Sequence, residues 1–544
     1  MCGIWARIGS SVDPSMIKKS LEKLVARGPE GTQITQVDKD VVFGFTRLAI
    51  NGLTNAGMQP YSKGNIHWIC NGEIYNSKAL EKSLGLENTG SDCHCIGDLY
   101  LRHRDDPAAF IRALDGVFAL VLYDGDLQKL IVARDPYGIR PLYMASAIAE
   151  FVFASELKAL LPEYENISAF LPGHLQVYET VTNTLIQDIE YHSVPWIINP
   201  EFRSSVTASL DQAANSLRFA LEEAVTKRML TDRPVAALLS GGLDSSLIAA
   251  LVQQNLNQLG QPPLKTYSIG FEGSSDVAHA RLVADWIGSD HTEIIMTPDE
   301  FFNAIPEVIK AIESFDTTTV RASTGNYLIA KKIRELSECK VVFNGDGSDE
   351  LFGGYLYFNR APNNEAFHAE TARLLKDLHY FDVLRSDRSI SANGLEARTP
   401  FLDKQFVAVV RSIDPDLLRP IPGKRMEKYI LRYAFDDGVT LPEEVLWRRK
   451  EAFSDGVSTP EKAWFQEIQD RVSKIVPANW KAKLSASPHL PPTTPEEYYY
   501  RFLFTTAYGL NAIKVATPYK WMPRWSPETT DPSARTLTVY AQAS

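Results

Sequence analysis

The sequence is poor in cysteine, in long apolar runs and in positive charge. Its five cysteines form no CxxC pair and no even framework, which fits a reducing compartment, so we expect a cytoplasmic protein. No apolar stretch approaches the length of a membrane span, and the start lacks the long apolar region of a signal peptide. The net charge of −11 argues against nucleic acid or a membrane surface as a partner.

The scarcity of cysteine also removes a metal site that one motif suggests. Cys93-His94-Cys95 is too tightly spaced for the usual CxxC-type zinc loop, and no second ligand pair follows it. What the sequence does contain is an ordinary globular composition, with 44% hydrophobic and 23% charged residues. A chain of 544 residues is too long for one core, which predicts two domains.

The first part of the chain has the pattern of short strands separated by turns. Strands are predicted at 41–45, 66–70, 118–123 and 130–133. Two helical patterns interleave with them, around residues 16–24 and 95–102. Because such strands need cover on both faces, we expect an antiparallel, layered α/β sandwich over residues 2–197.

The pattern lapses around residues 199–207, which predicts a domain boundary, and then changes. A helix at 210–229 is followed by buried strands at 235–239, 265–269 and 340–343 that alternate with helices. Further helices are predicted at 382–391, 405–412, 426–435 and 498–504. The alternation predicts a doubly wound parallel α/β sheet in a second domain, 208–517. Residues 518–544 are expected to be a flexible tail.

The chain opens with Met1-Cys2-Gly3-Ile4. Once the initiator methionine is removed, the thiol of Cys2 lies beside a free α-amino group. That amine has an ordinary pKa of about 7.7–8.0, so it can take the thiol proton near neutral pH. The motif therefore predicts a cysteine nucleophile that needs no histidine.

A glycine-rich loop, Leu239-Ser240-Gly241-Gly242-Leu243-Asp244-Ser245, follows one predicted strand and precedes a helix. Its glycines let backbone amides approach a phosphate, its hydroxyls donate, and the helix N-terminus adds partial positive charge. It lacks the lysine of the Walker pattern. It resembles instead the SGGxDS loop of enzymes that split ATP into AMP and pyrophosphate.

A second acidic, glycine-rich loop, Asn344-Gly345-Asp346-Gly347-Ser348-Asp349-Glu350, follows another strand of the same predicted sheet. Ligands collect at the carboxyl ends of parallel strands, so the two loops should meet. Mg²⁺ bound to phosphates takes one or two carboxylates from the protein. Asp244 and Asp349 are therefore the predicted magnesium ligands.

With these motifs in place, the chain resembles the glutamine-hydrolysing asparagine synthetases over nearly its whole length. The resemblance implies an Ntn-hydrolase-type αββα glutaminase domain, shared with class II amidotransferases, and an ATP-pyrophosphatase domain of the adenine-nucleotide type. The strings that match the glutaminase part include Arg27-Gly28-Pro29, Gly57-Met58-Gln59-Pro60, Asn71-Gly72-Glu73-Ile74-Tyr75-Asn76 and Gly90-Ser91-Asp92. Those of the synthetase part include Glu313-Ser314-Phe315-Asp316, Gly394-Leu395-Glu396-Ala397-Arg398 and Lys450-Glu451-Ala452-Phe453-Ser454-Asp455-Gly456.

The resemblance implies a chemistry for the first domain. The Cys2 thiolate attacks the side-chain amide of glutamine and releases ammonia, while Asn71 and the next backbone amide form the oxyanion hole. Arg47 clamps the α-carboxylate, and Glu73 and Asp92 hold the α-ammonium group. The implied glutamine-binding set is Arg47, Leu48, Ile50, Asn71, Gly72, Glu73 and Asp92.

For the second domain, the resemblance implies that ATP activates aspartate as β-aspartyl-AMP, with release of pyrophosphate. Ammonia that has passed through the protein then displaces AMP. Asp346 and Lys428 are the implied catalytic residues, and Leu239 and Ile269 flank the adenosine. The implied ATP-binding set is Leu239, Ser240, Gly241, Gly242, Asp244, Ser245, Ile269, Asn344 and Gly345. A homodimer is also implied.

Three strings depart from the family pattern. The usual Ser-Gly-Glu-Gly-Ser-Asp-Glu has Asn344 and Asp346 here, so the carboxylate thought to form or use the acyl-adenylate is one methylene shorter. The usual Ser-Thr-Pro-Met-Tyr reads Ser323-Thr324-Gly325-Asn326-Tyr327, and His-Arg-Gly-Pro-Asp reads Ala26-Arg27-Gly28-Pro29-Glu30. An active-site misplacement of ~1 Å can cost about a hundredfold in rate.

Three hypotheses follow. The first is an active asparagine synthetase that uses glutamine, aspartate and ATP. The second is a related ATP-dependent amidotransferase with another carboxylate substrate; β-lactam-forming relatives also replace that glutamate, but they usually lose the cysteine that this chain keeps. The third is a glutamine-binding protein with a degraded synthetase site, against which the intact Asp244 and Asp349 argue. The sequence leaves open the preference between ammonia and glutamine and the coupling of the two sites.

Overall fold

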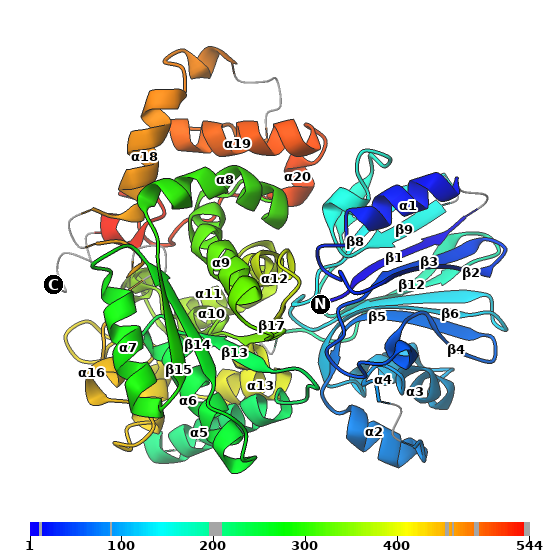
Figure 1. Cartoon of the computed structure of the whole chain (residues 1–544), viewed down its shortest axis with the longest axis horizontal. Coiled ribbons are helices and arrows are strands. Elements are labelled where there is room, and N and C mark those ends of the chain that lie inside the picture. Colours follow the sequence, from blue (N-terminus) through cyan, green and yellow to red (C-terminus); the bar gives the residue numbers. More distant parts are fainter. Residues whose placement is uncertain are drawn as a thin grey trace.

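The computed structural model describes residues 1–9, 13–87, 90–148, 150–194, 209–451, 456–459, 462–483 and 489–537. Figure 1 shows two lobes side by side, an N-terminal lobe of residues up to 194 and a C-terminal lobe of residues from 209. The predicted boundary at 199–207 lies outside the described residues. The domain limits of 2–197 and 208–517 therefore stay a prediction.

The N-terminal lobe is an αββα sandwich with two stacked antiparallel sheets (Figure 1). Its described strands are β1 (Gly3–Ile8), β2 (Thr32–Asp38), β3 (Val41–Thr46), β4 (Tyr61–Lys63), β5 (Ile66–Ile74), β6 (Gly116–Asp124), β7 (Lys129–Arg134), β8 (Tyr143–Ala147), β9 (Glu150–Ala154), β10 (Ile167–Ala169), β11 (His174–Glu179) and β12 (Thr184–Glu190). The strand orders are β10-β8-β9-β1-β3-β2 and β12-β11-β7-β6-β5-β4. Its helices are α1 (Pro14–Glu22), α2 (Ser77–Leu84), α3 (Ile96–Arg102) and α4 (Pro107–Arg112).

Strand β6 shows why the sandwich has four layers. Phe118, Leu120 and Leu122 pack in the cluster that reaches α3 and α4, whereas Val121 and Tyr123 pack in the cluster between the two sheets. Successive side chains of a strand point to opposite faces, so both faces of β6 are buried. The expected αββα sandwich is confirmed.

The C-terminal lobe is built on a parallel sheet with the order β15-β14-β13-β16-β17 among the described strands. These strands are β13 (Val235–Leu238), β14 (Lys265–Gly270), β15 (Asp290–Ile295), β16 (Val341–Phe343) and β17 (Glu396–Arg398). The helices are α5 (Leu210–Lys227), α6 (Leu243–Gln258), α7 (Ser275–Ile287), α8 (Pro298–Ile312), α9 (Thr317–Leu336), α10 (Ser348–Phe352), α11 (Asn364–Asp377), α12 (Asp382–Ser391), α13 (Lys404–Ser412), α14 (Pro415–Leu418), α15 (Tyr429–Ala434), α16 (Glu443–Leu446), α18 (Trp464–Ile475), α19 (Pro495–Tyr508) and α20 (Ile513–Ala516).

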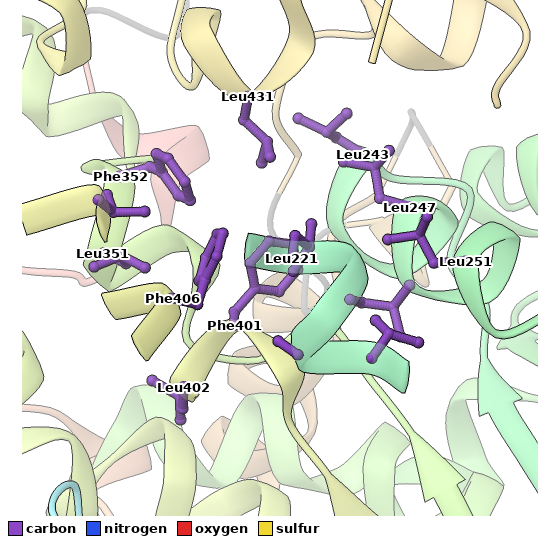
Figure 2. Packing of buried hydrophobic residues seen from close by; sticks show 14 of the residues in the cluster. Leu221, Leu243, Leu247, Leu251, Leu351, Phe352, Phe401, Leu402, Phe406 and Leu431 are labelled. Atoms are coloured by element: carbon purple, nitrogen blue, oxygen red, sulfur yellow. The ribbon is translucent and has the colours of Figure 1, made fainter. Parts of the chain in front are cut away.

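Helices cover both faces of this sheet, which confirms the doubly wound prediction. In β16, Val341 and Phe343 pack in one hydrophobic cluster, and Val342 packs in another on the opposite face. Figure 2 shows the first cluster, in which Leu221 of α5 and Phe406 of α13 pack among side chains of α6 and α10. Strand order reverses between β13 and β16, and the two glycine-rich loops leave the sheet at this switch point. Ligands of doubly wound folds bind there.

Local sequence signals set the ends of several helices. Ser209 and Gln212 form a capping box at the start of α5, and Thr297 and Glu300 form another at the start of α8. Helix α7 ends at Ile287, and the next residue, Gly288, has a φ of 71°, a left-handed conformation that favours glycine. The capping box explains why α5 begins at residue 210, as the sequence predicted, whereas the limits of α7 and α8 were not predicted.

The segment after residue 517 differs from the flexible tail that we expected. Over 518–537 it packs on the C-terminal lobe, with Trp521 and Leu537 buried in the first cluster. The backbone N–H of Trp521 donates to Asp316 Oδ1 at 3.0 Å, and Asp531 pairs with Arg321 at 2.8 Å. These partners are distant in sequence, so no local pattern announces them. Residues 538–544 lie outside the described part.

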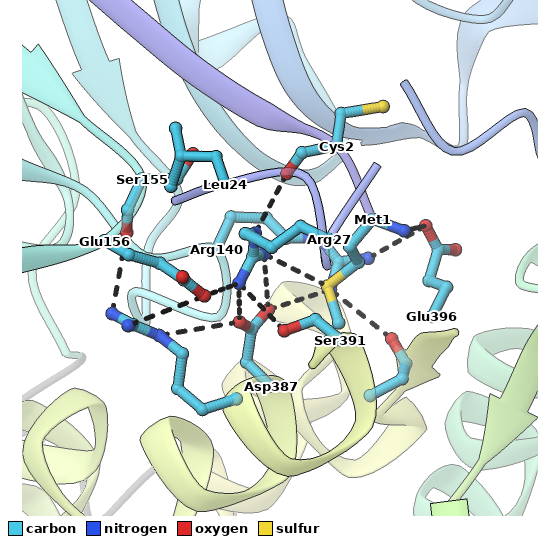
Figure 3. Close-up of polar contacts among 12 residues, drawn as sticks. Met1, Cys2, Leu24, Arg27, Arg140, Ser155, Glu156, Asp387, Ser391 and Glu396 are labelled. Atoms are coloured by element: carbon cyan, nitrogen blue, oxygen red, sulfur yellow. Dashed lines mark hydrogen bonds and ion pairs between the residues drawn. The ribbon is translucent and has the colours of Figure 1, made fainter. Parts of the chain in front are cut away.

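The two lobes share a buried interface. Tyr137 and Ile139 of the first lobe belong to the same hydrophobic cluster as the helices of the second. A charged network lies beside it, in which Arg27 pairs with Asp387 at 2.7 Å and with Glu156 at 2.9 Å (Figure 3). Because the hydrophobic cluster and the charged network are both buried, they hold the two lobes in a defined relative position. No helix within the described ranges is long and apolar enough to cross a bilayer.

Candidate active sites

Cys2 lies immediately before β1, at the edge of the interface between the lobes. Its Sγ atom is 3.5 Å from the backbone nitrogen of Leu48 and 3.6 Å from the backbone oxygen of Leu48. Leu48 and Ile50, both predicted to bind glutamine, are buried in the segment after β3. Burial raises the pKa of the Cys2 thiol to about 11, although the nearby amino terminus acts to lower it. A base is therefore needed to form the thiolate.

The predicted oxyanion hole lies on β5. The side chain of Asn71 is fully buried, and neither its Oδ1 nor its Nδ2 has a hydrogen-bond partner among the described residues. A buried carboxamide without a partner is costly, so its amide is available to a ligand. A Cβ on Gly72 would collide with the backbone oxygen of Val117, so the close pairing of β5 with β6 requires glycine.

Two buried carboxyl groups accompany these residues. Burial raises the pKa of Asp92 to about 6, against the hydrogen bond that its Oδ2 accepts from the Ile74 N–H at 2.7 Å. Burial, with the charges of Glu396 and Asp92, also raises the pKa of Glu73. The Glu73 charge in turn contributes to the raised pKa of Cys2. The structure thus brings Cys2, Glu73 and Asp92 within electrostatic range of one another.

Arg47 turns its guanidinium toward the loop that follows β3. Nη1 donates to the backbone oxygen of Thr54 at 2.8 Å, and Nη2 donates to that of Gly52. Both of these hydrogen bonds are to neutral backbone carbonyls. Because its partners are neutral carbonyls, its positive charge remains available to an anion.

The second site is a cavity of about 200 Å³ at the carboxyl ends of β13, β14 and β16. The predicted residues that line it are Leu239, Ser240, Gly242, Asp244, Ser245, Ile269, Asn344, Gly345, Asp346, Asp349 and Lys428. Gly241 does not line it. Its φ of 68° and its contact with His279 and Ala280 make it the residue that shapes the turn.

The two glycine-rich loops are held against each other. The hydroxyl of Ser245 accepts from the Ser240 N–H at 3.1 Å, which fixes the first loop. A Cβ on Gly345 would lie 2.8 Å from the Cβ of Asp244, so the second loop approaches the first only because glycine stands there. Ser348 Oγ donates to Asp244 Oδ1 at 2.8 Å and bridges the loops.

Two lysines lie between the acidic side chains of these loops. Lys428 Nζ is 2.5 Å from both Asp244 Oδ2 and Asp349 Oδ1, and Lys450 Nζ is 2.6 Å from Asp349 Oδ2. Burial acts to raise the pKa of Asp349, but the two ammonium groups hold it well below its usual range. Across the described residues, no group of three or more His, Cys, Asp or Glu side chains is arranged to hold a metal ion.

Asp346 carries the unusual carboxylate of the second loop. Its Oδ1 is 2.9 Å from Nη2 of Arg385, whereas its Oδ2 is buried without a hydrogen-bond partner among the residues described. Asn344 Nδ2 donates to Ser386 Oγ at 2.7 Å. Asn326, the other departure, is 4% exposed on α9 and lines the same cavity. The departures at Asn344, Asp346 and Asn326 therefore lie in one site.

Sequence reasoning missed several residues of this cavity. Arg385, Arg448 and Trp521 line it, and Lys450 was noted only as part of a matching string. Arg448 Nη1 donates to the backbone oxygen of Gly241 at 3.1 Å. These residues are distant in sequence from the two glycine-rich loops. The one sequence signal was the family-matching string that contains Lys450, and that string did not indicate a function for the lysine.

Comparison with known proteins identifies the family. The asparagine synthase family model matches residues 216–369 and 359–530, and the glutamine amidotransferase domain model matches 1–200. The chain is 41% identical over 568 aligned residues to "Asparagine synthetase [glutamine-hydrolyzing]" of Gallus gallus, with 100% of both chains covered. It is 41% identical to that of Mus musculus and 40% to that of Homo sapiens, each with the same full coverage. The chain therefore belongs to the asparagine synthase family.

Proposed function

We propose that the protein is a glutamine-dependent asparagine synthetase. It would hydrolyse glutamine at Cys2 and use the ammonia to convert aspartate and ATP into asparagine, AMP and pyrophosphate. The observation that carries the proposal is one chain in which a lobe with a half-buried Cys2 and an unpartnered Asn71 is joined to a cavity where Asp244 and Asp349 meet Lys428. The full-length similarity to glutamine-hydrolysing asparagine synthetases supports it.

In the first site, removal of Met1 exposes the α-amine of Cys2, which takes the thiol proton. The thiolate attacks the amide carbon of glutamine, and the resulting oxyanion accepts from Asn71 Nδ2 and the Gly72 N–H. The amine returns the proton to the leaving nitrogen, and ammonia departs as the C–N bond breaks. Water then hydrolyses the thioester to glutamate and restores the thiol.

Glutamine is held by charges on both sides of its α-carbon. Arg47, whose described partners are neutral carbonyls, binds the α-carboxylate. Glu73 and Asp92, both buried, hold the α-ammonium group. Leu48 and Ile50, both buried, lie in the segment that begins with Arg47. This arrangement places the side-chain amide, and not the α-amino group, at Cys2.

In the second site, a β-carboxylate oxygen of aspartate attacks the α-phosphorus of ATP, and the bond to pyrophosphate breaks. Lys428 and Lys450 balance the phosphate charge, and Leu239 and Ile269 flank the adenosine. Asp346, which lines the cavity and keeps one oxygen without a hydrogen-bond partner among the described residues, acts on the acyl-adenylate. Ammonia that reaches the cavity through the interface between the lobes attacks the acyl carbon, and AMP leaves.

Mg²⁺ fits the acidic residues of this cavity. Asp244 and Asp349 direct carboxylate oxygens at one common point, now held by the Lys428 ammonium, and Mg²⁺ on ATP takes one or two such oxygens. When bound, the ion supplies charge neutralisation to the phosphates. We also propose that the protein is a cytoplasmic homodimer. Light scattering after gel filtration of the native protein tests the dimer.

Product identification tests the proposal. Untagged protein is incubated with amide-¹⁵N glutamine, ATP, magnesium and aspartate, and pyrophosphate is followed in parallel. The expected result is labelled asparagine in proportion to pyrophosphate. Pyrophosphate and a labelled amide that form only when another carboxylate replaces aspartate would indicate another carboxylate substrate, which the departures at Asn344, Asp346 and Asn326 make the specific alternative. Glutamate without asparagine or pyrophosphate would indicate that the second site uses another substrate or is degraded.

A further inference from the structure

Arg398 extends from the C-terminal lobe toward the proposed glutamine site. It ends β17, the edge strand that lies next to the N-terminal lobe in Figure 1. Its side chain is fully buried, with Nη2 3.3 Å from Glu73 Oε2 and Nε 3.0 Å from Glu396 Oε1. Nη1 donates to the backbone oxygen of Leu230 at 2.7 Å. The guanidinium is therefore fixed from three sides.

The backbone of the same residue binds a residue that lines the nucleotide cavity. The oxygen of Arg398 accepts from the Asn344 N–H at 3.0 Å, and Arg398 pairs with Phe343 in the parallel register of β16 and β17. Asn344 lines the cavity, and its Oδ1 accepts from the Asp346 N–H at 3.3 Å. One residue thus contacts both sites, with its side chain at one and its backbone at the other.

We propose that Arg398 is a positioning residue that the C-terminal lobe contributes to the glutamine site, where it holds the Glu73 carboxylate for the α-ammonium group of glutamine. The proposal rests on the role of Glu73 given above. Glu73 follows Gly72 directly on β5, so holding Glu73 also helps to hold the strand that carries the oxyanion donors. Glutamine binding should therefore depend on a residue from outside the glutaminase part.

The charge balance around Glu73 explains why it needs this partner. Burial, Glu396 and Asp92 all favour its protonated form, whereas Arg398 favours the carboxylate. The titratable and charged groups that face it are Arg398, Arg140, Glu396, Asp92, Cys2 and Cys93. Without Arg398, Glu73 would take up a proton more readily and would attract the ammonium group less.

Arg228 provides a matched control. Its guanidinium is 2% exposed and lies 4.6 Å from the centre of the Tyr75 ring, the same ring that Arg398 approaches at 5.8 Å. Its carboxylate partner, however, is Asp403 at 2.7 Å rather than Glu73. A purely structural role of a buried arginine at this interface would give both residues the same effect.

The test uses full-length protein and steady-state kinetics with glutamine and, separately, with ammonia. Arg398→Gln should raise KM for glutamine by about tenfold or more, since the buried ion pair with the Glu73 carboxylate is lost. It should change kcat far less and leave ammonia-dependent synthesis intact. The raised KM should fall as pH rises, because Glu73 then loses its proton. Arg398→Lys should recover part of the effect, and Arg228→Gln should leave KM within about twofold.

Several outcomes would overturn the proposal. An unchanged KM in Arg398→Gln, or an equal rise in Arg228→Gln, would show that Arg398 only packs the interface. If Arg398→Gln does not fold, Arg398→Lys is combined with Glu73→Gln, and effects on KM that simply add would refute the contact. An unchanged KM in Glu73→Gln alone would instead refute the proposed role of Glu73, so the two failures are distinct.

Discussion

The ammonium nitrogen of Lys428 lies 2.5 Å from Asp244 Oδ2, which joins a residue of the first glycine-rich loop to one from the start of α15. The same nitrogen is 2.5 Å from Asp349 Oδ1 of the second loop. One buried cation therefore organises the acidic groups of both loops. Breaking this set should affect the nucleotide cavity and leave the distant cysteine site unchanged.

We predict that Asp244→Asn abolishes pyrophosphate release and asparagine synthesis but spares glutaminase turnover. The amide keeps the size of the side chain but removes the charge that pairs with Lys428 and that Mg²⁺ requires. Pyrophosphate and glutamate are measured on the same sample. Asp290→Asn, at an exposed pair with Lys265, is the control and should retain both activities. Normal synthesis by Asp244→Asn would disprove the magnesium assignment.

Cys2→Ala should abolish glutamine-dependent synthesis and retain ammonia-dependent synthesis. The thiol is the proposed nucleophile, whereas the cavity of the second lobe needs only the nitrogen. Cys339→Ala, which removes a buried thiol from the second lobe, should keep both activities. Loss of ammonia-dependent synthesis in Cys2→Ala would mean that the two sites do not act separately.

Much of the fold follows from local pattern. The strand predicted at 235–239 is β13 (Val235–Leu238), and the helix predicted at 382–391 is α12 with the same limits. The helix predicted at 426–435 is shorter, because α15 starts only at Tyr429. Lys428 before it has a left-handed φ of 58°, held by ion pairs with residues far along the chain. Hydrophobic periodicity does not report such pairs.

The candidate sites also contain some features that local sequence predicts and others that depend on partners distant in sequence. The glycine-rich loops are local signals, because a turn that needs a left-handed residue or a close backbone approach leaves glycine in the sequence. Gly241 and Gly345 are examples. Arg385 and Arg398 act through partners that lie next to them only after folding, so single-sequence reasoning could not assign them. Resemblance suggested Lys428, but its two partners emerged only from the structure.

Asp346→Glu should lower synthesis by about ten- to a hundredfold without affecting glutaminase activity. Arg385 already contacts the shorter carboxylate at 2.9 Å, so an added methylene would displace this cavity-lining carboxylate by ~1 Å. Rates of asparagine and pyrophosphate formation with saturating ammonia measure this. An increased rate would instead mean that Asp346 is a poor substitute for the family's glutamate and that the loop tolerates the longer side chain.

Phe406→Ala should lower the free energy of unfolding of the C-terminal lobe by about 3–5 kcal/mol, the usual cost of emptying a buried aromatic site. Phe406 is fully buried, with its ring 6.1 Å from Phe352 and 5.8 Å from Phe401 (Figure 2). Urea unfolding followed by circular dichroism measures the change. Phe406→Leu, which removes less volume, should cost less; equal losses would argue against a cavity effect.

The pH dependence of glutamine binding should report Asp92. Burial raises its pKa to about 6, so the group is charged above that pH and neutral below it. A neutral Asp92 attracts the α-ammonium group of glutamine less, so KM for glutamine should rise as pH falls below about 6. The sign for stability is the opposite: a carboxyl group whose pKa is raised on folding favours the folded state at low pH, so lost affinity there is not a sign of unfolding. Asp92→Asn should have a high KM at every pH, whereas Asp98→Asn, at a pair with Lys63, should keep the wild-type profile. A flat profile in the wild-type protein would exclude Asp92 from the site.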